Sequence, residues 1–329
     1  MRLDFRVAPL QASVGVVSAL LLASLTWGTA SASAATVEPT PVPARSYYVG
    51  STSTTQAENE GCEQGEENLV NLERAVVILD FGGQLKDGGA KSIVVSKLKF
   101  TRAQIEAYAE AFANGYLACY EPFSDDAAPA AGGVSQSLAL AIGTSNDLHE
   151  VSEAGGTAWA GDVAAVARYV LEYPAQAEQV AIWGGNDFEN AYSTGSKALK
   201  WAKGYSAATE SPYVDYGDAG GCSETNHKNE SCTLAEHNKS GWDQKVFYEV
   251  SWGIRGANPT PEIYVPGNAQ QWGQIDLYGG GTMSFLGPLD ENREDEPGGG
   301  FDPNEAWHAL HSELSEEDLN YGLPYSLTI

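Results

Sequence analysis

The chain has 329 residues, and its 18 Lys and Arg against 44 Asp and Glu give a formal net charge of −26 at neutral pH. So acidic a chain repels phosphate backbones and other polyanions, which excludes nucleic acid, anionic membranes and polyanionic wall polymers as expected partners. An acidic surface also favours solubility, so the charge by itself names no ligand.

The first 34 residues resemble an export signal. Arg2 and Arg6 precede an apolar run over residues 14–27, and residues 32–34 (Ala-Ser-Ala) offer a small-residue cleavage site. A membrane anchor is the alternative, although the run is short for a span of roughly 20 residues. We therefore expect a secreted, extracellular protein that leaves the membrane once the signal is cleaved.

Residues 35–61 are rich in Thr, Ser, Pro and Glu, which predicts a disordered leader. About 265 residues follow without a second linker, so we expect one domain over residues 62–329. We expect it to be a monomer.

Eight short apolar runs are candidate strands. They are 75–80, 92–95, 138–143, 180–183, 213–215, 246–251, 262–265 and 283–286. Several are continuously apolar, as parallel strands buried on both faces are.

Helical patterns lie between these runs. The clearest begins at Thr101, a candidate N-cap with Gln104 three residues on, as in a capping box. Others span 162–172, 196–208, 268–277 and 304–314. This alternation predicts an α/β fold, a single (β/α)8-type (TIM-like) barrel with irregular loops; an open doubly wound sheet is the alternative.

Two irregular stretches interrupt the pattern, an Ala-, Pro- and Gly-rich segment at 121–135 and an acidic, glycine-rich segment at 290–303. Both are typical of solvated connections, and an active-site lid is the alternative reading.

Four cysteines in an exported chain indicate two disulfides among three connectivities. Cys222 and Cys232 close a short loop of turn-forming residues, which leaves Cys62 to pair with Cys119. The alternative is a zinc site, because cysteine and histidine recur every five residues at Cys222, His227, Cys232 and His237.

Acidic residues repeatedly follow or end the predicted strands. Asp187 and Glu189 follow an apolar run and two glycines, and on an extended chain residues i and i+2 share a side, roughly 6.5–7 Å apart. Such a pair repels, so one carboxyl tends to stay protonated as a general acid; a turn or helix-cap role is the alternative.

Asp80, Asp215 and Glu249 are further candidates, because the carboxyl ends of parallel strands share one face. Calcium binding by Asp215 and Asp218 is an alternative use of these oxygens. Four interleaved aromatic residues, Trp183, Tyr213, Tyr216 and Trp252, are suited to stacking on a carbohydrate, or else they belong to the core.

The segments WGGNDFE, YVDYGDAGGC, VFYEVSWG and PEIYVPGNAQQW resemble uncharacterised exported actinobacterial proteins with a glycoside-hydrolase-like barrel. The Asp-x-Glu at a strand end is similar to glycoside hydrolase families 25 and 18. That resemblance implies Glu189 as general acid, Asp187 as its partner and Asp80 as an early acidic site residue.

The sequence therefore predicts a secreted glycoside hydrolase acting on a neutral or N-acetylated polysaccharide such as peptidoglycan or chitin. The partner would be a cell-wall glycan, with no cofactor and no metal. The alternative is a non-catalytic carbohydrate-binding protein on the same barrel.

Overall fold

The computed structural model describes residues 40–71, 74–120, 137–147, 151–172, 179–233, 241–291, 300–319 and 322–329. The predicted signal peptide and the greater part of the 121–135 and 290–303 segments lie outside the described residues. No helix within the described ranges is long and apolar enough to cross a bilayer.

The larger sheet is parallel through its centre. Its main strands are β3 (Ala75–Gln84), β6 (Leu138–Ser145), β7 (Val180–Asp187), β8 (Tyr213–Asp215) and β9 (Ala257–Pro259), joined in that order. At one edge, β4 (Ala90–Lys91) pairs antiparallel with β3 and β5 (Lys99–Phe100) pairs antiparallel with β4, while β2 (Tyr47–Tyr48) pairs parallel with β3.

A second, three-stranded parallel sheet joins β1 (Val42–Arg45), β11 (Tyr325–Thr328) and β10 (Leu289–Asp290). A single parallel bridge between Glu262 and Leu289 lies between the two sheets. The structure thus has a parallel α/β architecture, but the predicted eight-stranded closed barrel is not formed as one continuous sheet among the described residues.

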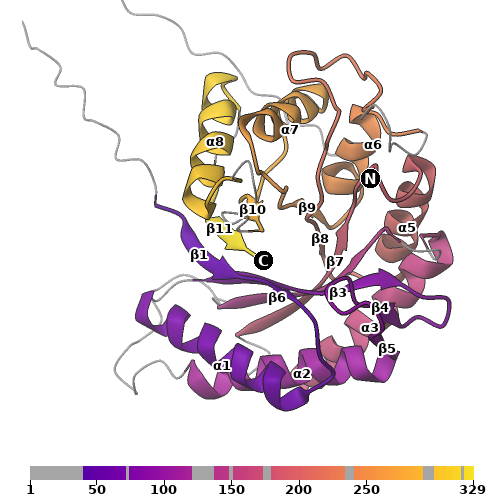
Figure 1. Cartoon of the computed structure of the whole chain (residues 1–329), viewed down its shortest axis with the longest axis vertical. Helices are drawn as coiled ribbons and strands as arrows, with labels where there is room; N and C mark the ends of the chain where they lie inside the picture. The colour runs from indigo at the N-terminus through magenta and orange to yellow at the C-terminus, as the bar shows by residue number, and fades with distance from the viewer. Residues whose placement is uncertain are drawn as a thin grey trace, which may run out of the picture. The chain divides into compact units, whose positions relative to one another are not determined.

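The helices α1 (Thr54–Asn71), α2 (Arg102–Cys119), α3 (Glu153–Leu171), α5 (Gly195–Ala208), α6 (Gln244–Tyr248), α7 (Pro266–Tyr278) and α8 (Pro303–Glu316) surround the strands. Figure 1 shows α1, α2 and α3 on the outer side of β3 and β6, and α8 beside β10 and β11. The capping box predicted at Thr101 and Gln104 opens α2.

Helices α1 and α2 pack closely. A Cβ on Gly61 would lie 2.1 Å from the Phe112 carbonyl oxygen, so only glycine permits this approach. The disulfide Cys62–Cys119 joins the same two helices, as predicted. The stretch predicted as a leader contains β1 and the start of α1, which its Thr- and Pro-rich composition concealed.

The predicted strand 246–251 is wrong. These residues form α6 and the following π-helical turn η1 (Glu249–Gly253), because Asp243 Oδ1 accepts a hydrogen bond from the Val246 amide at 2.8 Å and caps the helix. The predicted strand 262–265 is also misplaced, since the strand is β9, ending at Pro259. Near the predicted strands 92–95 and 283–286, the strands are β4 and β10.

Candidate functional site

Asp80 and Asp187 project from the same face of the parallel sheet. Asp80 is paired with Gly143, which is paired with Gly185, two residues before Asp187 on β7. Paired residues share a face and alternate residues return to it, so the two carboxyl groups are offset by two residues, about 6.6 Å along the strand. Both residues also lie near the carboxyl ends of their strands, where the sequence predicted the site.

Two glycines leave room for a tyrosine on this face. A Cβ on Gly143 would lie 2.6 Å from the Tyr216 hydroxyl, and one on Gly185 would lie 3.0 Å from the Tyr216 ring. The hydroxyl donates a hydrogen bond to the Thr144 carbonyl at 3.0 Å. Tyr216 is therefore a buried wall of the site, with its ring against β6 and β7.

Three carboxylates converge at the end of β7. One oxygen each from Asp187, Glu189 and Glu262 lie within 4.8 Å of one another. Asp187 and Glu262 are only 7 % and 4 % exposed. Oδ1 of Asp187 is buried and has no hydrogen-bond partner among the described residues. A buried carboxylate that has an oxygen without a hydrogen-bond partner and lies beside two other carboxylates is a geometry that a cation would satisfy.

The charges in this cluster reinforce one another. Burial, followed by the negative charge of Glu189, raises the pKa of both Asp187 and Glu262 well above the usual range. Burial also raises the pKa of Asp80 to about 6, against the opposing hydrogen bond of the Gly82 amide. The site therefore binds protons or a cation more readily than isolated carboxylates would.

Tyrosine side chains border the carboxylates. The Tyr48 hydroxyl donates a hydrogen bond to Glu291, and the Tyr264 hydroxyl, as a donor, opposes the rise in the pKa of Glu262. Tyr192 is 38 % exposed, and the charges of Glu189 and Asp187 add to the burial that raises its pKa. These hydroxyls supply the neutral hydrogen-bond donors of the site.

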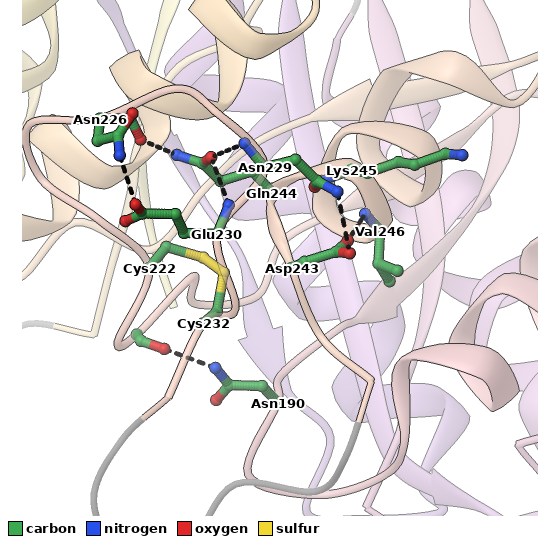
Figure 2. Close-up of a disulfide and its surroundings, with 11 residues drawn as sticks. Asn190, Cys222, Asn226, Asn229, Glu230, Cys232, Asp243, Gln244, Lys245 and Val246 are labelled. Carbon is green, nitrogen blue, oxygen red and sulfur yellow. Dashed lines mark hydrogen bonds between the residues drawn. A yellow bond between two sulfur atoms is a disulfide. The ribbon is translucent and has the colours of Figure 1, made fainter.

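A disulfide-closed loop supports the segment that carries Glu189. Figure 2 shows Asn190 directed toward this loop, and its side-chain amide donates to the Gly220 carbonyl at 2.5 Å. The Cys222–Cys232 bond, which was predicted, closes the loop, and Gln244 accepts from the Asn229 amide at 2.9 Å. Because both cysteines are oxidised, the zinc alternative fails; His237 lies outside the described residues.

Asp215 does not join the cluster. In the β7–β8 register it pairs with Asn186, so its side chain points to the opposite face from Asp187. There its Oδ2 accepts a hydrogen bond from Ser251 Oγ at 2.5 Å, and its Oδ1 accepts one from the Gly217 amide. Its partner in the calcium alternative, Asp218, accepts instead from Asn268 at 3.1 Å.

Glu249 and Trp252 also lie elsewhere, in η1, the turn that leads directly into the start of β9. They are thus at the amino end of the sheet. Trp183 lines a pocket of about 380 Å³ with Val180 and Leu171, at the start of β7 and the end of α3. Tyr213 is fully buried, with its ring against Trp201 and Tyr205. The predicted sugar-stacking aromatics are therefore core or amino-end residues.

Sequence reasoning missed Glu262, Glu291, Tyr48, Tyr192 and Tyr264. Of these residues, Glu262 was the easiest to find from the sequence, since it follows a strand as Asp187 does. The strand was predicted at 262–265, which put Glu262 at the start of a strand, whereas β9 ends at Pro259 and Glu262 follows it.

No family model matches the chain, and no curated protein matches it. Among solved structures, it is similar to a sugar phosphate isomerase/epimerase from Parabacteroides distasonis, with a TM-score of 0.41 and 10 % identity over 90 % of each chain. The resemblance to glycoside hydrolase families 25 and 18 is not supported.

The expectation of a polysaccharide glycosidase, or of a glycan-binding protein on the same fold, is corrected. Glycosidases typically act through one pair of carboxyl groups, and Asp187 and Glu189 have oxygens within 4.8 Å of each other. The cluster also includes a third carboxylate, and none of the four predicted aromatic residues offers an open stacking surface beside it.

Proposed function

We propose that Asp187, Glu189 and Glu262 bind one divalent cation, and that the protein uses it as an isomerase or epimerase of a small sugar. The convergence of these three carboxylates, with a buried oxygen of Asp187 left without a partner, carries the proposal. A divalent cation between them would offset the repulsion that raises the pKa of Asp187 and Glu262.

The ligand set favours a hard cation. All three donors are carboxylate oxygens, which suit Mg²⁺, Mn²⁺ or Ca²⁺ better than a thiolate-preferring metal. Three protein ligands leave coordination positions for two oxygens of a substrate. A hydroxyl and an adjacent carbonyl of a sugar would fill them, and a bound cation would polarise the carbonyl.

The remaining groups are suited to proton transfer next to that carbonyl. Asp80 lies on the same face, and a carboxyl whose pKa is about 6 can accept and return a proton near neutral pH. Because Asp187 and Glu262 are almost fully buried, a small molecule reaches their oxygens more readily than a polymer does.

The arrangement of the strands supports a barrel-like frame for this site. Only Ser46 separates β1 of the smaller sheet from β2 of the larger one, and the Glu262–Leu289 bridge links the other edges. Such a frame would bring Glu262 around to face Asp187. The two disulfides support an oxidising compartment and hence the export of the protein.

Calorimetric titration with MnCl2, MgCl2 and CaCl2 tests the cation site. We expect one site per chain in the wild type, binding at least tenfold weaker in Glu262→Gln, and unchanged binding in the control Glu249→Gln. Proton NMR in D2O then tests the reaction, because isomerisation or epimerisation through proton transfer exchanges the hydrogen beside the carbonyl. Cation binding that is identical in the two variants would refute the assignment.

A further inference from the structure

We propose that the ligand of this site is electrically neutral, an uncharged sugar or polyol, and that the site discriminates against phosphorylated and acidic sugars. This inference rests on the proposed function and narrows its substrate class. It follows from the charges that remain after a cation binds, from the absence of a compensating base beside the cluster among the described residues, and from the nature of the hydrogen-bond donors.

The cluster stays negative with its cation in place. Asp187, Glu189 and Glu262 together carry one negative charge more than a divalent cation neutralises when all three are ionised. Glu291 acts electrostatically on Glu262, and Asp80 acts on Asp187, so both further carboxylates belong to the same field. An anionic substituent on the ligand would enter this field at a cost that a hydroxyl group avoids.

The charged neighbours with the largest effects at the site are all acidic. The side chains that act on Asp187, Glu262 and Tyr192 through their charge are carboxylates. The ion pairs formed by the described arginines lie elsewhere, at Arg45 with Glu63 and Glu67, Arg102 with Asp162, and Arg255 with Glu210. A phosphate group commonly needs arginine, lysine or several backbone amides, and none of these pairs provides one here.

The donors that do line the site are phenolic. The hydroxyls of Tyr48, Tyr192 and Tyr264 lie near the carboxylates, and a phenol carries its proton at neutral pH. A tyrosine hydroxyl both donates and accepts, which matches the hydroxyl groups of a neutral sugar.

Two lysines share this face of the described sheet, and Lys91 on β4 lies nearer to Asp187 than Lys99, its paired residue on β5. The register runs from Lys91 to Gly83, then to Ser145 and Asp187, so Lys91 is three strands from Asp187, about 14 Å at the usual strand spacing. It is the residue that would hold an anionic end of a ligand if the proposal were wrong. Replacing Lys91 therefore distinguishes a site for neutral ligands from a site for anionic ligands.

The experiment uses the full chain loaded with Mn²⁺. Manganese binding is first measured alone by electron paramagnetic resonance. Dissociation constants are then measured by calorimetry for D-fructose, D-xylose, D-fructose 6-phosphate and D-glucuronate, with inorganic phosphate as a control for direct binding to manganese. We expect each neutral sugar to bind at least tenfold tighter than each charged sugar. Glu291→Gln should reduce the ratio between the dissociation constants of the charged and the neutral sugars, and Lys91→Ala should leave this ratio unchanged.

The outcomes distinguish the two proposals. Failure to bind Mn²⁺ would overturn the proposed function and this inference together. Manganese binding combined with equal or tighter binding of D-fructose 6-phosphate, lost in Lys91→Ala, would overturn this inference alone. So would manganese binding with no affinity for either neutral sugar.

Discussion

Asp187 and Glu262 meet at one face of the structure although 75 residues separate them in the chain and their strands are not neighbours. Asp187 ends β7, and Glu262 follows β9, two strands further along the sheet. Both side chains are nearly buried, and the negative charge of Glu189 adds to the burial that raises the pKa of each. The protein thus holds together carboxylates that repel, which costs stability unless a ligand offsets the repulsion.

The first prediction follows from that cost. Replacing Glu262 by Gln removes one charge from the cluster while keeping its shape. In the presence of EDTA, the variant should be more stable than wild type, because the raised pKa of Glu262 shows that its ionised form is disfavoured in the folded protein. Urea denaturation measures this change. Glu249→Gln, at the other end of the sheet, should leave stability unaltered, and a less stable Glu262→Gln protein would contradict the account.

The second prediction concerns pH. Burial raises the pKa of Asp80 to about 6. It also raises the pKa values of Asp162 and Asp215 to about 7, because the effect of burial outweighs that of the hydrogen bonds these two carboxyl groups accept. Between the ordinary value of 3.8 and these values, the folded protein binds more protons than the unfolded chain. The stability contribution of these groups is therefore complete below pH 4 and is lost as the pH rises through 6 to 7.

Calorimetric melting of the cation-free protein should accordingly give a higher Tm at pH 5 than at pH 8, by on the order of 5 °C. Added Mn²⁺ should reduce the difference by stabilising the protein at pH 8. A Tm that rises steadily from pH 5 to pH 8 without a cation would be inconsistent with these buried acids.

The third prediction tests the packing of Tyr216. Gly143→Ala would place a Cβ 2.6 Å from the Tyr216 hydroxyl, and we expect a loss of about 1–3 kcal/mol with weaker cation binding. Gly161→Ala is the matched control, because its Cβ would meet only the end of the Arg102 side chain, at 3.1 Å, and alanine favours a helix. Equal stability of the two variants would show that Tyr216 can move freely.

The fourth prediction separates the two disulfides. Chain entropy gives a loss of about 3 kcal/mol for removing Cys222–Cys232 and about 4 kcal/mol for Cys62–Cys119, whose loop is longer. The first disulfide begins two residues after Gly220, whose carbonyl accepts a hydrogen bond from Asn190, beside Glu189. The Cys222→Ser and Cys232→Ser double variant should therefore weaken Mn²⁺ binding, and the Cys62→Ser and Cys119→Ser pair should not. Calorimetry at a temperature where both remain folded decides between them.

Much of the fold was predictable because its signals are local. The apolar runs of β3, β6 and β7 and the capping box of α2 depend on neighbouring residues, and the structure confirms them. The strand predicted at 246–251 was wrong because a short apolar run has no period that distinguishes a strand from a helix. The contact that decides for the helix is the hydrogen bond from the Val246 amide to the Asp243 cap.

The site was predictable only in part, for a related reason. Asp80, Asp187 and Glu189 follow continuous apolar strands, so their shared face could be inferred from local sequence. The contribution of Glu262 depends on where β9 ends, and that of Tyr48 and Glu291 on pairings between distant segments. Asp215 was predicted to share the cleft with Asp187. Its side chain points to the opposite face, because Asp215 pairs with Asn186 rather than with Asp187, and only the strand register reveals this.

The cation site is tested most directly by a crystal of the protein soaked in MnCl2 and measured at an X-ray wavelength where manganese scatters anomalously. We predict one strong anomalous peak, about 2.0–2.6 Å from carboxylate oxygens of Asp187, Glu189 and Glu262. The same peak should be absent from Glu262→Gln. A map with no peak among these residues at saturating Mn²⁺, or with a peak that persists in the variant, would contradict the account.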